Sequence, residues 1–241
     1  MKTVLHKASE RGHANHGWLD SYHSFSFAEY YDPAHMQYSV LRVINEDKIA
    51  GGTGFGMHGH RDMEIITYML GGEIRHQDSM GNGAVIRAGD VQRMSAGTGV
   101  RHSEMNASTS SEAHLLQIWL LPAQNGLPPS YEDKTIPLES KLNRWALVAS
   151  PDARNDSMII HQDVELWATV LEQGHALDYK LHATRCAYVQ VARGQIMLNG
   201  KTLQAGDAAM VEAEALLSLK AELESEILLF DLPQLNQASI A

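Results

Sequence analysis

Between residues 38 and 121 the chain is a series of short apolar or alternating segments separated by glycine-rich turns. Gly71-Gly72 and Gly81-Asn82-Gly83 supply turn sequences of the kind that join antiparallel strands. No long helical period interrupts this half. An antiparallel barrel or sandwich is the fold that such closely spaced strands predict. The candidate strands are 38–44, 63–70, 73–76, 84–87, 91–94 and 114–121.

A polar segment rich in proline follows this half. Four of the seven prolines fall there, at Pro122, Pro128, Pro129 and Pro137. Because proline interrupts both helices and sheet ladders, we predict a linker over 122–145 that holds neither a strand nor a helix. The strand signal then returns over 165–171, 187–192, 195–198, 208–211 and 227–232. The chain therefore divides into predicted domains at 1–121 and 146–241, each long enough to bury a core.

The two halves align as a degenerate internal repeat. In the alignment His60, Glu64, Gly72, Gly89 and Asp90 match His182, Cys186, Gly194, Gly206 and Asp207. Lys180 takes the position of His58, and no histidine matches His102. A protonated lysine cannot coordinate a metal, and one histidine alone is not a site. Only the first half is predicted to bind a metal.

Charge and composition exclude several classes of protein. A formal net charge of -10 and a pI near 5.7, without a compensating basic run, disfavour direct nucleic-acid binding. The single cysteine excludes an intramolecular disulfide and agrees with a reducing compartment. No segment approaches the length of an apolar membrane span, and residues 1–7 do not lead into an apolar signal core. We expect no membrane segment and a cytoplasmic location.

A histidine motif lies at the start of the predicted barrel. The sequence reads Gly52, five residues, His58, one residue, His60, three residues, Glu64, six residues, Gly71. Side chains two positions apart on a strand point to the same face, so His58 and His60 can hold one ion between them. Imidazole nitrogens suit first-row transition metals.

A second motif begins at Gly89 and ends in His102-Ser103-Glu104. His102 and Glu104 again share a strand face, and they offer a third nitrogen and a carboxylate oxygen. Three histidines and one carboxylate leave room for water or substrate at the ion. Nitrogen and oxygen ligands accept iron, manganese, nickel, copper, cobalt and zinc, so the sequence predicts one divalent transition metal without selecting it.

Together the two motifs resemble the paired motifs of the cupin superfamily, and the first fits the cupin spacing throughout. Ser95 stands where cupins usually have proline, and His102 comes two residues later than usual. A narrower resemblance, to the pirins, is dense over residues 11–121. It is carried by the runs GHANHGWLDSYHSFSF at 12–27, HGHRDME at 58–64 and GDVQRMSAG at 89–97, followed by His102-Ser103-Glu104.

The pirin resemblance implies an all-β bicupin: two antiparallel β-barrels of the double-stranded β-helix or jelly-roll type, joined by a linker, with metal in the N-terminal barrel. It further implies that His58, His60, His102 and Glu104 are the metal ligands. Most cupins would use the position of Glu64 instead, and the spacing alone does not decide between the two carboxylates. Glu64 is then expected near a ligand histidine, and either glutamate is a candidate catalytic base.

Pirin-like proteins are associated with quercetin 2,3-dioxygenase activity. The resemblance therefore implies an enzyme that opens a flavonol ring with O2 and releases carbon monoxide. Two alternatives stay open: a metal- or redox-sensing protein that regulates a partner protein, and a metal that only stabilises the first barrel. The leader residues His13, His16, Trp18 and His23 are predicted to have a structural role, because side chains on an extended segment need not converge.

Overall fold

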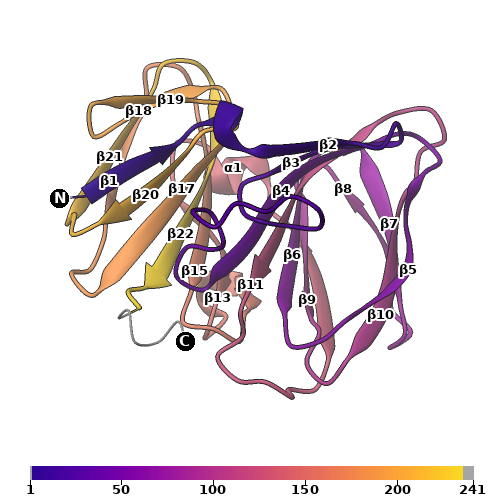
Figure 1. Cartoon of the computed structure of the whole chain (residues 1–241). Helices are drawn as coiled ribbons and strands as arrows, with labels where there is room; N and C mark the ends of the chain where they lie inside the picture. The colour runs from indigo at the N-terminus through magenta and orange to yellow at the C-terminus, as the bar shows by residue number, and fades with distance from the viewer. Residues whose placement is uncertain (1, 236–241) are drawn as a thin grey trace. The chain divides into compact units, whose positions relative to one another are not determined.

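The computed structural model describes residues 2–235, which consist almost entirely of β-strands (Figure 1). The chain forms two compact units. The first barrel comprises residues 11–135 and 160–162, and the second comprises the residues up to Glu10, 136–159 and those from Asp163 onward. The helices within residues 2–235 are short turns, and none has the length and apolar character of a membrane-spanning segment.

The first barrel is built from eleven strands. They are β2 (Gly12–Asn15), β3 (Leu19–His23), β4 (Leu41–Ile49), β5 (Gly54–His60), β6 (Glu64–Gly71), β7 (Glu73–Asp78), β8 (Gly83–Arg87), β9 (Asp90–Ser95), β10 (Val100–Asn106), β11 (Ala113–Leu120) and β12 (Ser130–Thr135).

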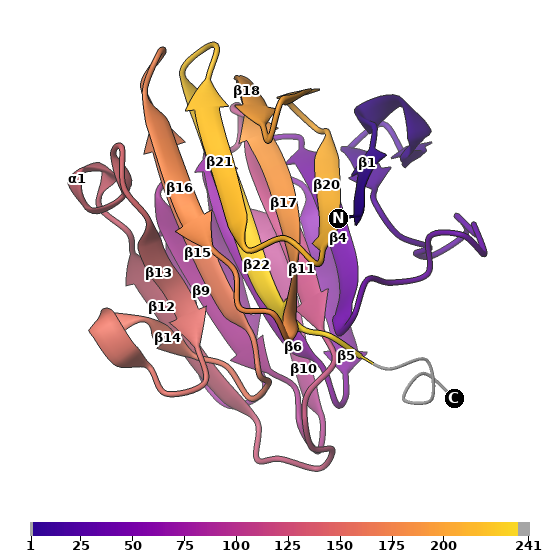
Figure 2. The same ribbon diagram turned by 90° about the vertical axis from the view of Figure 1, so that its left-hand side faces the viewer.

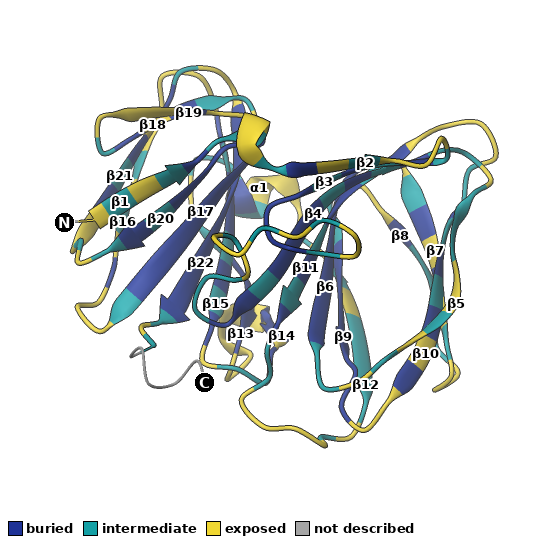
Figure 3. Ribbon diagram, in the orientation of Figure 1, coloured by how far each residue is buried: buried dark blue, intermediate teal, exposed yellow. Residues whose placement is uncertain are grey.

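These strands form two antiparallel sheets. One sheet has seven strands in the order β12-β9-β6-β11-β4-β3-β2, and the other has four in the order β5-β10-β7-β8. Ile49 and Met69 of the larger sheet cluster with Ile74 and Ile86 of the smaller one. The core therefore lies between the two sheets, and β6 is buried along almost its whole length (Figure 3).

The second barrel repeats this design. Its elements are β1 (Lys2–His6), the 3₁₀ turn Ala8–Glu10, α1 (Leu138–Lys141), β13 (Ala146–Ser150), the 3₁₀ turn Arg154–Asp156, β14 (Met158–Ile159), β15 (Glu165–Leu171), β16 (Ala176–Lys180), β17 (Arg185–Arg193), β18 (Gln195–Leu198), β19 (Lys201–Gln204), β20 (Ala208–Glu212), β21 (Leu216–Ala221) and β22 (Ser225–Pro233).

The order of strands within the sheets shows the repeat directly. The smaller sheet of the second barrel runs β16-β21-β18-β19, with β16, β21 and β18 side by side in Figure 2, and its larger sheet runs β1-β20-β17-β22-β15-β13-β14. Apart from the short parallel pair β13–β14, all of these pairings are antiparallel. The prediction of two antiparallel barrels, with a degenerate repeat between them, is confirmed.

The predicted boundaries differ from the two units. The N-terminal strand β1 pairs with β20 in the second barrel, although residues 1–121 are the predicted first domain. The prediction that 122–145 holds no strand or helix is wrong, because β12 pairs with β9 along its full length and α1 follows. Pro128, Pro129 and Pro137 lie outside β12, where they leave its backbone donors intact.

Candidate metal centre

The antiparallel pair β5–β10 brings the two histidine motifs together. His58 lies opposite His102, and His60 lies opposite Val100. The strands can approach this closely because residue 54 is glycine. A Cβ at Gly54, whose φ is +154°, would run into the backbone of Glu104 and Met105. The glycine at this position thus allows the close spacing of the pair.

Three imidazole rings converge at this pair. The Nε2 atoms of His58 and His102 are 3.1 Å apart. The ring centroid of His60 lies 4.7 Å from that of His58 and 4.8 Å from that of His102. One nitrogen from each ring lies within 4.8 Å of the others, which is close enough for a single ion to bind all three.

The protonation of these rings suits metal binding. His58 Nδ1 lies 2.8 Å from the carbonyl oxygen of Gly56, which only accepts, so Nδ1 carries the proton and Nε2 keeps a lone pair. Burial lowers the pKa of His60 to about 4 and that of His102 to about 3, and neighbouring imidazoles add to the effect. His102 Nδ1 is buried without a hydrogen-bond partner among the described residues. Burial therefore favours the neutral forms of His60 and His102, and the neutral imidazole is the form that binds a transition-metal ion.

Glu104 lies on the same buried face of β10 as His102 and is held by amide groups of the larger sheet. Gln92 Nε2 donates to its Oε1, and Gln117 Nε2 donates to its Oε2 at 2.8 Å. Thr67 Oγ1 lies 3.0 Å from Oε1. The carboxylate therefore has a fixed orientation beside the histidine cluster.

His76 of β7 lies on the other side of His102. It is fully buried, and one of its ring nitrogens lies within 4.8 Å of a ring nitrogen of His102 and of a carboxylate oxygen of Glu104. The two groups of potential ligands share His102, so they describe one metal-binding region. The sequence motifs did not single out His76, because it belongs to neither of them.

Glu64 lies outside both groups of potential ligands. It is buried at the start of β6, where its Oε2 accepts a hydrogen bond from Ser95 Oγ at 2.9 Å and one from the backbone N–H of His161 at 3.2 Å. Neither group of potential ligands includes it, and it does not line the cavity beside the histidines. Of the two carboxylates, only Glu104 belongs to a group of potential ligands, which it forms with His76 and His102 and not with His58 and His60.

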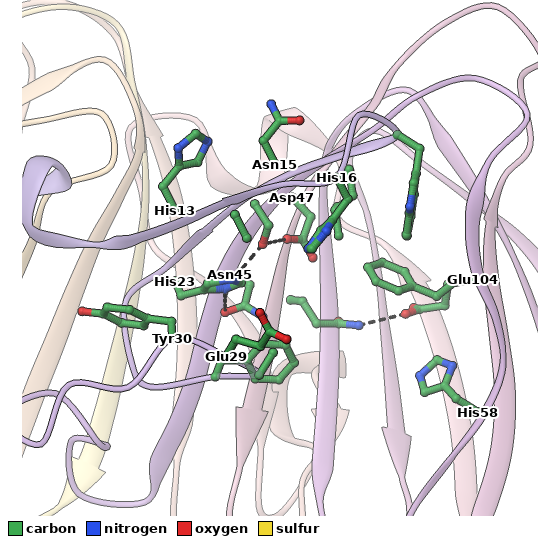
Figure 4. Close-up of a pocket in the computed structure, with 18 of the residues that line it drawn as sticks. His13, Asn15, His16, His23, Glu29, Tyr30, Asn45, Asp47, His58 and Glu104 are labelled. Carbon is green, nitrogen blue, oxygen red and sulfur yellow. Dashed lines mark hydrogen bonds between the residues drawn. The ribbon is translucent and has the colours of Figure 1, made fainter.

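A cavity of about 890 Å³ opens beside the cluster. His58, His60, Glu104 and Gln117 contribute to its wall, together with aromatic side chains from several elements (Figure 4). The aromatic members are Trp18, Phe27, Tyr30, Phe55 and Trp119. Its volume falls within the range of small-molecule sites, and one wall is lined with potential metal ligands.

The leader segment supplies a large part of the cavity wall. His13, His16, Trp18 and His23, expected to be structural, all line it, because β2–β3 is a hairpin that pairs with β4. Sequence reasoning also missed Thr67, Gln92 and Gln117. The sequence did contain one signal that could have identified such residues. Thr67 is a polar residue within the otherwise apolar and buried strand β6.

The second barrel has apolar residues at the corresponding positions. Thr67 pairs with Gln92 and Gln117 across neighbouring strands, whereas Val189, its match in the repeat, pairs with Ala209 and Leu229. Likewise His76 pairs with Glu104, whereas Leu198 pairs with Leu219. These second-barrel residues all belong to one buried apolar cluster. Among the described residues of this barrel no comparable group of ligands is found.

Two repeated antiparallel barrels define a bicupin, and within residues 2–235 a histidine cluster is found only in the first barrel. Residues 4–120 match the family model described as Pirin, and residues 147–232 match that of the quercetinase C-terminal cupin domain. The chain is 49% identical to quercetin 2,3-dioxygenase of Escherichia coli K12 over 229 residues, which cover 95% of this chain and 98% of that one. This chain belongs to the pirin family.

Two further relatives support the assignment to the pirin family. A pirin-like protein of Caulobacter vibrioides is 41% identical over 91% of this chain and 95% of its own. The crystal structure of the Escherichia coli bacterial pirin YhhW in complex with nickel(II) superimposes with a TM-score of 0.93 at 48% identity, over 97% of this chain and all of that one. The predicted pirin-type bicupin fold and the likeness to enzymes of the quercetin 2,3-dioxygenase type are confirmed.

Proposed function

We propose that this protein is a metal-dependent dioxygenase that acts on flavonols such as quercetin, opening the ring with O2 and releasing carbon monoxide. The observation that carries the proposal is the convergence of three imidazoles on the wall of an aromatic-lined cavity. The name of the 49% identical Escherichia coli relative supplies the substrate class.

We assign His58, His60, His102 and Glu104 as the ligands of one divalent transition metal. Their nitrogen and oxygen donors accept iron, manganese, nickel, copper, cobalt or zinc. Nickel(II) is the first to test, because it is the ion in the Escherichia coli pirin complex. When bound, the metal supplies a Lewis acid and a template for substrate and dioxygen.

The chain's own residues would orient the substrate and move its proton. Trp119, Phe27 and Phe55 offer flat surfaces against which an aromatic ring can pack. Glu104 would accept the proton of the flavonol hydroxyl, in an orientation set by Gln92 and Gln117. Both oxygen atoms of O2 enter the product, and one ring carbon leaves as carbon monoxide.

The cavity also bears on the alternatives. His58 and His60 are half-buried and line an open space, which favours exchangeable positions at the ion over a purely structural metal. A regulatory partner protein and the cytoplasmic location stay predictions from the sequence.

The test is a spectral assay of quercetin consumption with the full chain, freed of metal and reloaded with each candidate ion, with and without O2. We expect turnover and carbon monoxide only with both metal and O2. His60→Ala should abolish them, whereas His182→Ala, at the aligned position of the second barrel, should not. Equal turnover by wild type and His60→Ala would remove this centre from the mechanism. Metal binding without turnover of any flavonol would favour the regulatory alternative.

A further inference from the structure

A second polar group lines the same cavity, on the paired strands β3 and β4. Ser21 lies opposite Asp47, and His23 lies opposite Asn45. All four side chains line the cavity, yet they are only 2%, 4%, 5% and 3% exposed, respectively. By contrast, the cavity-lining side chains of His13, Asn15, His16 and Glu29 are exposed. The buried group is thus a polar patch within the cavity and not part of its outer rim.

The hydrogen bonds within this group leave specific atoms unused. Ser21 Oγ donates to Asp47 Oδ1, and His23 Nδ1 lies 2.9 Å from Asn45 Oδ1. Because an amide oxygen only accepts, His23 carries its proton on Nδ1 and keeps a lone pair on Nε2. Within residues 2–235, no hydrogen-bond partner is found for His23 Nε2, Asn45 Nδ2 or Asp47 Oδ2.

Asp47 is a carboxyl group with little exposure and no cationic partner within the part of the chain that the structure describes. No lysine, arginine or histidine of the described chain forms an ion pair with it. Burial raises the pKa of Asp47 to about 7, although the hydrogen bond from Ser21 opposes the shift. The unpaired atoms of this group belong to side chains that line the cavity, so an occupant of the cavity can form hydrogen bonds with them.

The chemistry of the occupant follows from the unused atoms. His23 Nε2 and, when Asp47 is ionised, Asp47 Oδ2 accept hydrogen bonds, and Asn45 Nδ2 donates one. Two neighbouring hydroxyl groups on an aromatic ring offer two donors, and their oxygens also accept. The remaining wall near the group is aromatic, with Phe27 5.5 Å from His23 between ring centroids. Figure 4 shows His23, Asn45 and Asp47 together, apart from His58.

We infer that Ser21, His23, Asn45 and Asp47 form a second, metal-independent subsite that binds a ring with two neighbouring hydroxyls, at the end of the substrate that does not face the histidines. This inference rests on the proposed function, because it assigns the pendant ring of a flavonol to the subsite. His23, Asn45 and Asp47 would be the specificity-determining residues, and Ser21 would position Asp47.

The test compares two probes that differ only in the pendant ring. Quercetin carries two neighbouring hydroxyls there, and galangin carries none. Binding to the as-purified full chain is measured under nitrogen, where no turnover can occur. We expect wild type to prefer quercetin by about tenfold, as one or two net hydrogen bonds would give. In Asp47→Leu the preference should fall to near one while galangin affinity stays unchanged, and Asp47→Asn, which keeps an acceptor, should restore part of it.

Unchanged galangin affinity in Asp47→Leu shows that the cavity is still folded. Asp178→Leu, at an exposed position of β16 in the second barrel, is the control and should keep the full preference. Equal binding of the two probes by wild type, no binding of either, or an undiminished preference in Asp47→Leu would overturn the subsite. A different result, the absence of O2-dependent turnover, would contradict the proposed function. The ratio of the quercetin and galangin affinities could still be measured in that case, because binding is assayed without O2.

Discussion

The Nε2 atoms of His58 and His102 face each other at 3.1 Å. Since Gly56 holds the proton of His58 on Nδ1, the proton shared by the two facing nitrogens belongs to His102. For one metal ion to bind both Nε2 atoms, this proton would move to His102 Nδ1, which has no hydrogen-bond partner among the described residues. The two facing nitrogens therefore support the proposed role of His58 and His102 as metal ligands.

The first prediction concerns the number of ions bound. Because, among the residues that the structure describes, only the first barrel brings potential ligands together, the full chain should bind one nickel(II) ion, measured by calorimetry and elemental analysis. His102→Ala should weaken binding by at least about a hundredfold, since it removes a ligand common to both groups. At a nickel concentration of about 100 Kd, the ion should stabilise wild type by about 2.7 kcal/mol and His102→Ala by far less.

The matched control is His182→Ala. His182 aligns with His60, but it is exposed, and its Nδ1 lies 2.9 Å from Thr184 Oγ1. This variant should keep one ion with unchanged affinity. Two ions per chain, or equal losses in both variants, would contradict the single centre.

The second prediction concerns the amides that hold Glu104. Gln117→Leu removes the donor to Glu104 Oε2 and introduces the residue type found at the matching position, Leu229. Loss of such a supporting group lowers metal affinity or turnover by about 10–100-fold. Nickel titration should show the loss of metal affinity, and the quercetin assay should show the loss of turnover, while the thermal unfolding temperature changes little.

Gln195→Leu is the control for this change. Gln195 also donates its amide to a carboxylate, that of Glu222, but in the second barrel. It should leave nickel affinity and turnover unchanged. Equal effects of the two substitutions would mean that Gln117 acts through general stability and not through Glu104.

The sequence predicted the parts of the site that depend on local spacing. His58 with His60, and His102 with Glu104, lie two residues apart, so strand alternation alone puts each pair on one face. The sequence also predicts that the second barrel lacks a metal site, because Lys180 replaces a histidine in the alignment. Which of the two carboxylates lies near a histidine of the cluster depends on how the strands pair, and no local pattern contains that information.

Other parts of the molecule depend on contacts between distant segments. Gln92 of β9 and Gln117 of β11 both donate hydrogen bonds to Glu104. Neither glutamine belongs to a recognisable sequence motif, so the sequence did not predict these contacts. The strand β12 was missed because its residues are mostly polar and only partly buried, and backbone bonds to β9 hold it at the edge of its sheet. The leader reaches the cavity because β3 pairs with β4, a relation that only the topology shows.

The third prediction compares two glycines of the first barrel. Gly97 has φ of +45°, and a Cβ there would run into the carbonyl oxygen of Leu127. Gly89 has φ of +89°, with nothing within 4 Å of an added Cβ. Gly89→Ala should cost only the left-handed backbone strain, about 1–2 kcal/mol, whereas Gly97→Ala should cost clearly more. Urea unfolding of both variants measures the difference in the free energy of unfolding. Equal losses of stability in the two variants would show that the backbone near Leu127 can shift at little cost.

The fourth prediction concerns acid stability and rests on Glu46. Its Oε2 accepts from Arg11 Nη1 at 2.8 Å, and its Oε1 lies 3.0 Å from His114 Nε2. Burial alone would favour the neutral acid, but the hydrogen bond with His114 and the charge of Arg11 lower the pKa of Glu46 to about 2. A carboxyl whose pKa is lower in the folded state stabilises the fold above its unfolded pKa, and this contribution is lost as pH falls through the folded value.

The expected window therefore runs from the ordinary value of 4.5 down to about 2. The contribution at neutral pH is up to about 3 kcal/mol, at 1.36 kcal/mol per pKa unit. Glu46→Gln should lower the free energy of unfolding at pH 7, and its difference from wild type should shrink as the pH falls from 4.5 to 2. Glu112→Gln, at an exposed position, should show no such convergence. A constant difference between wild type and Glu46→Gln over this window would mean that the variant is destabilised by altered packing, and that the charge of Glu46 contributes nothing to the fold.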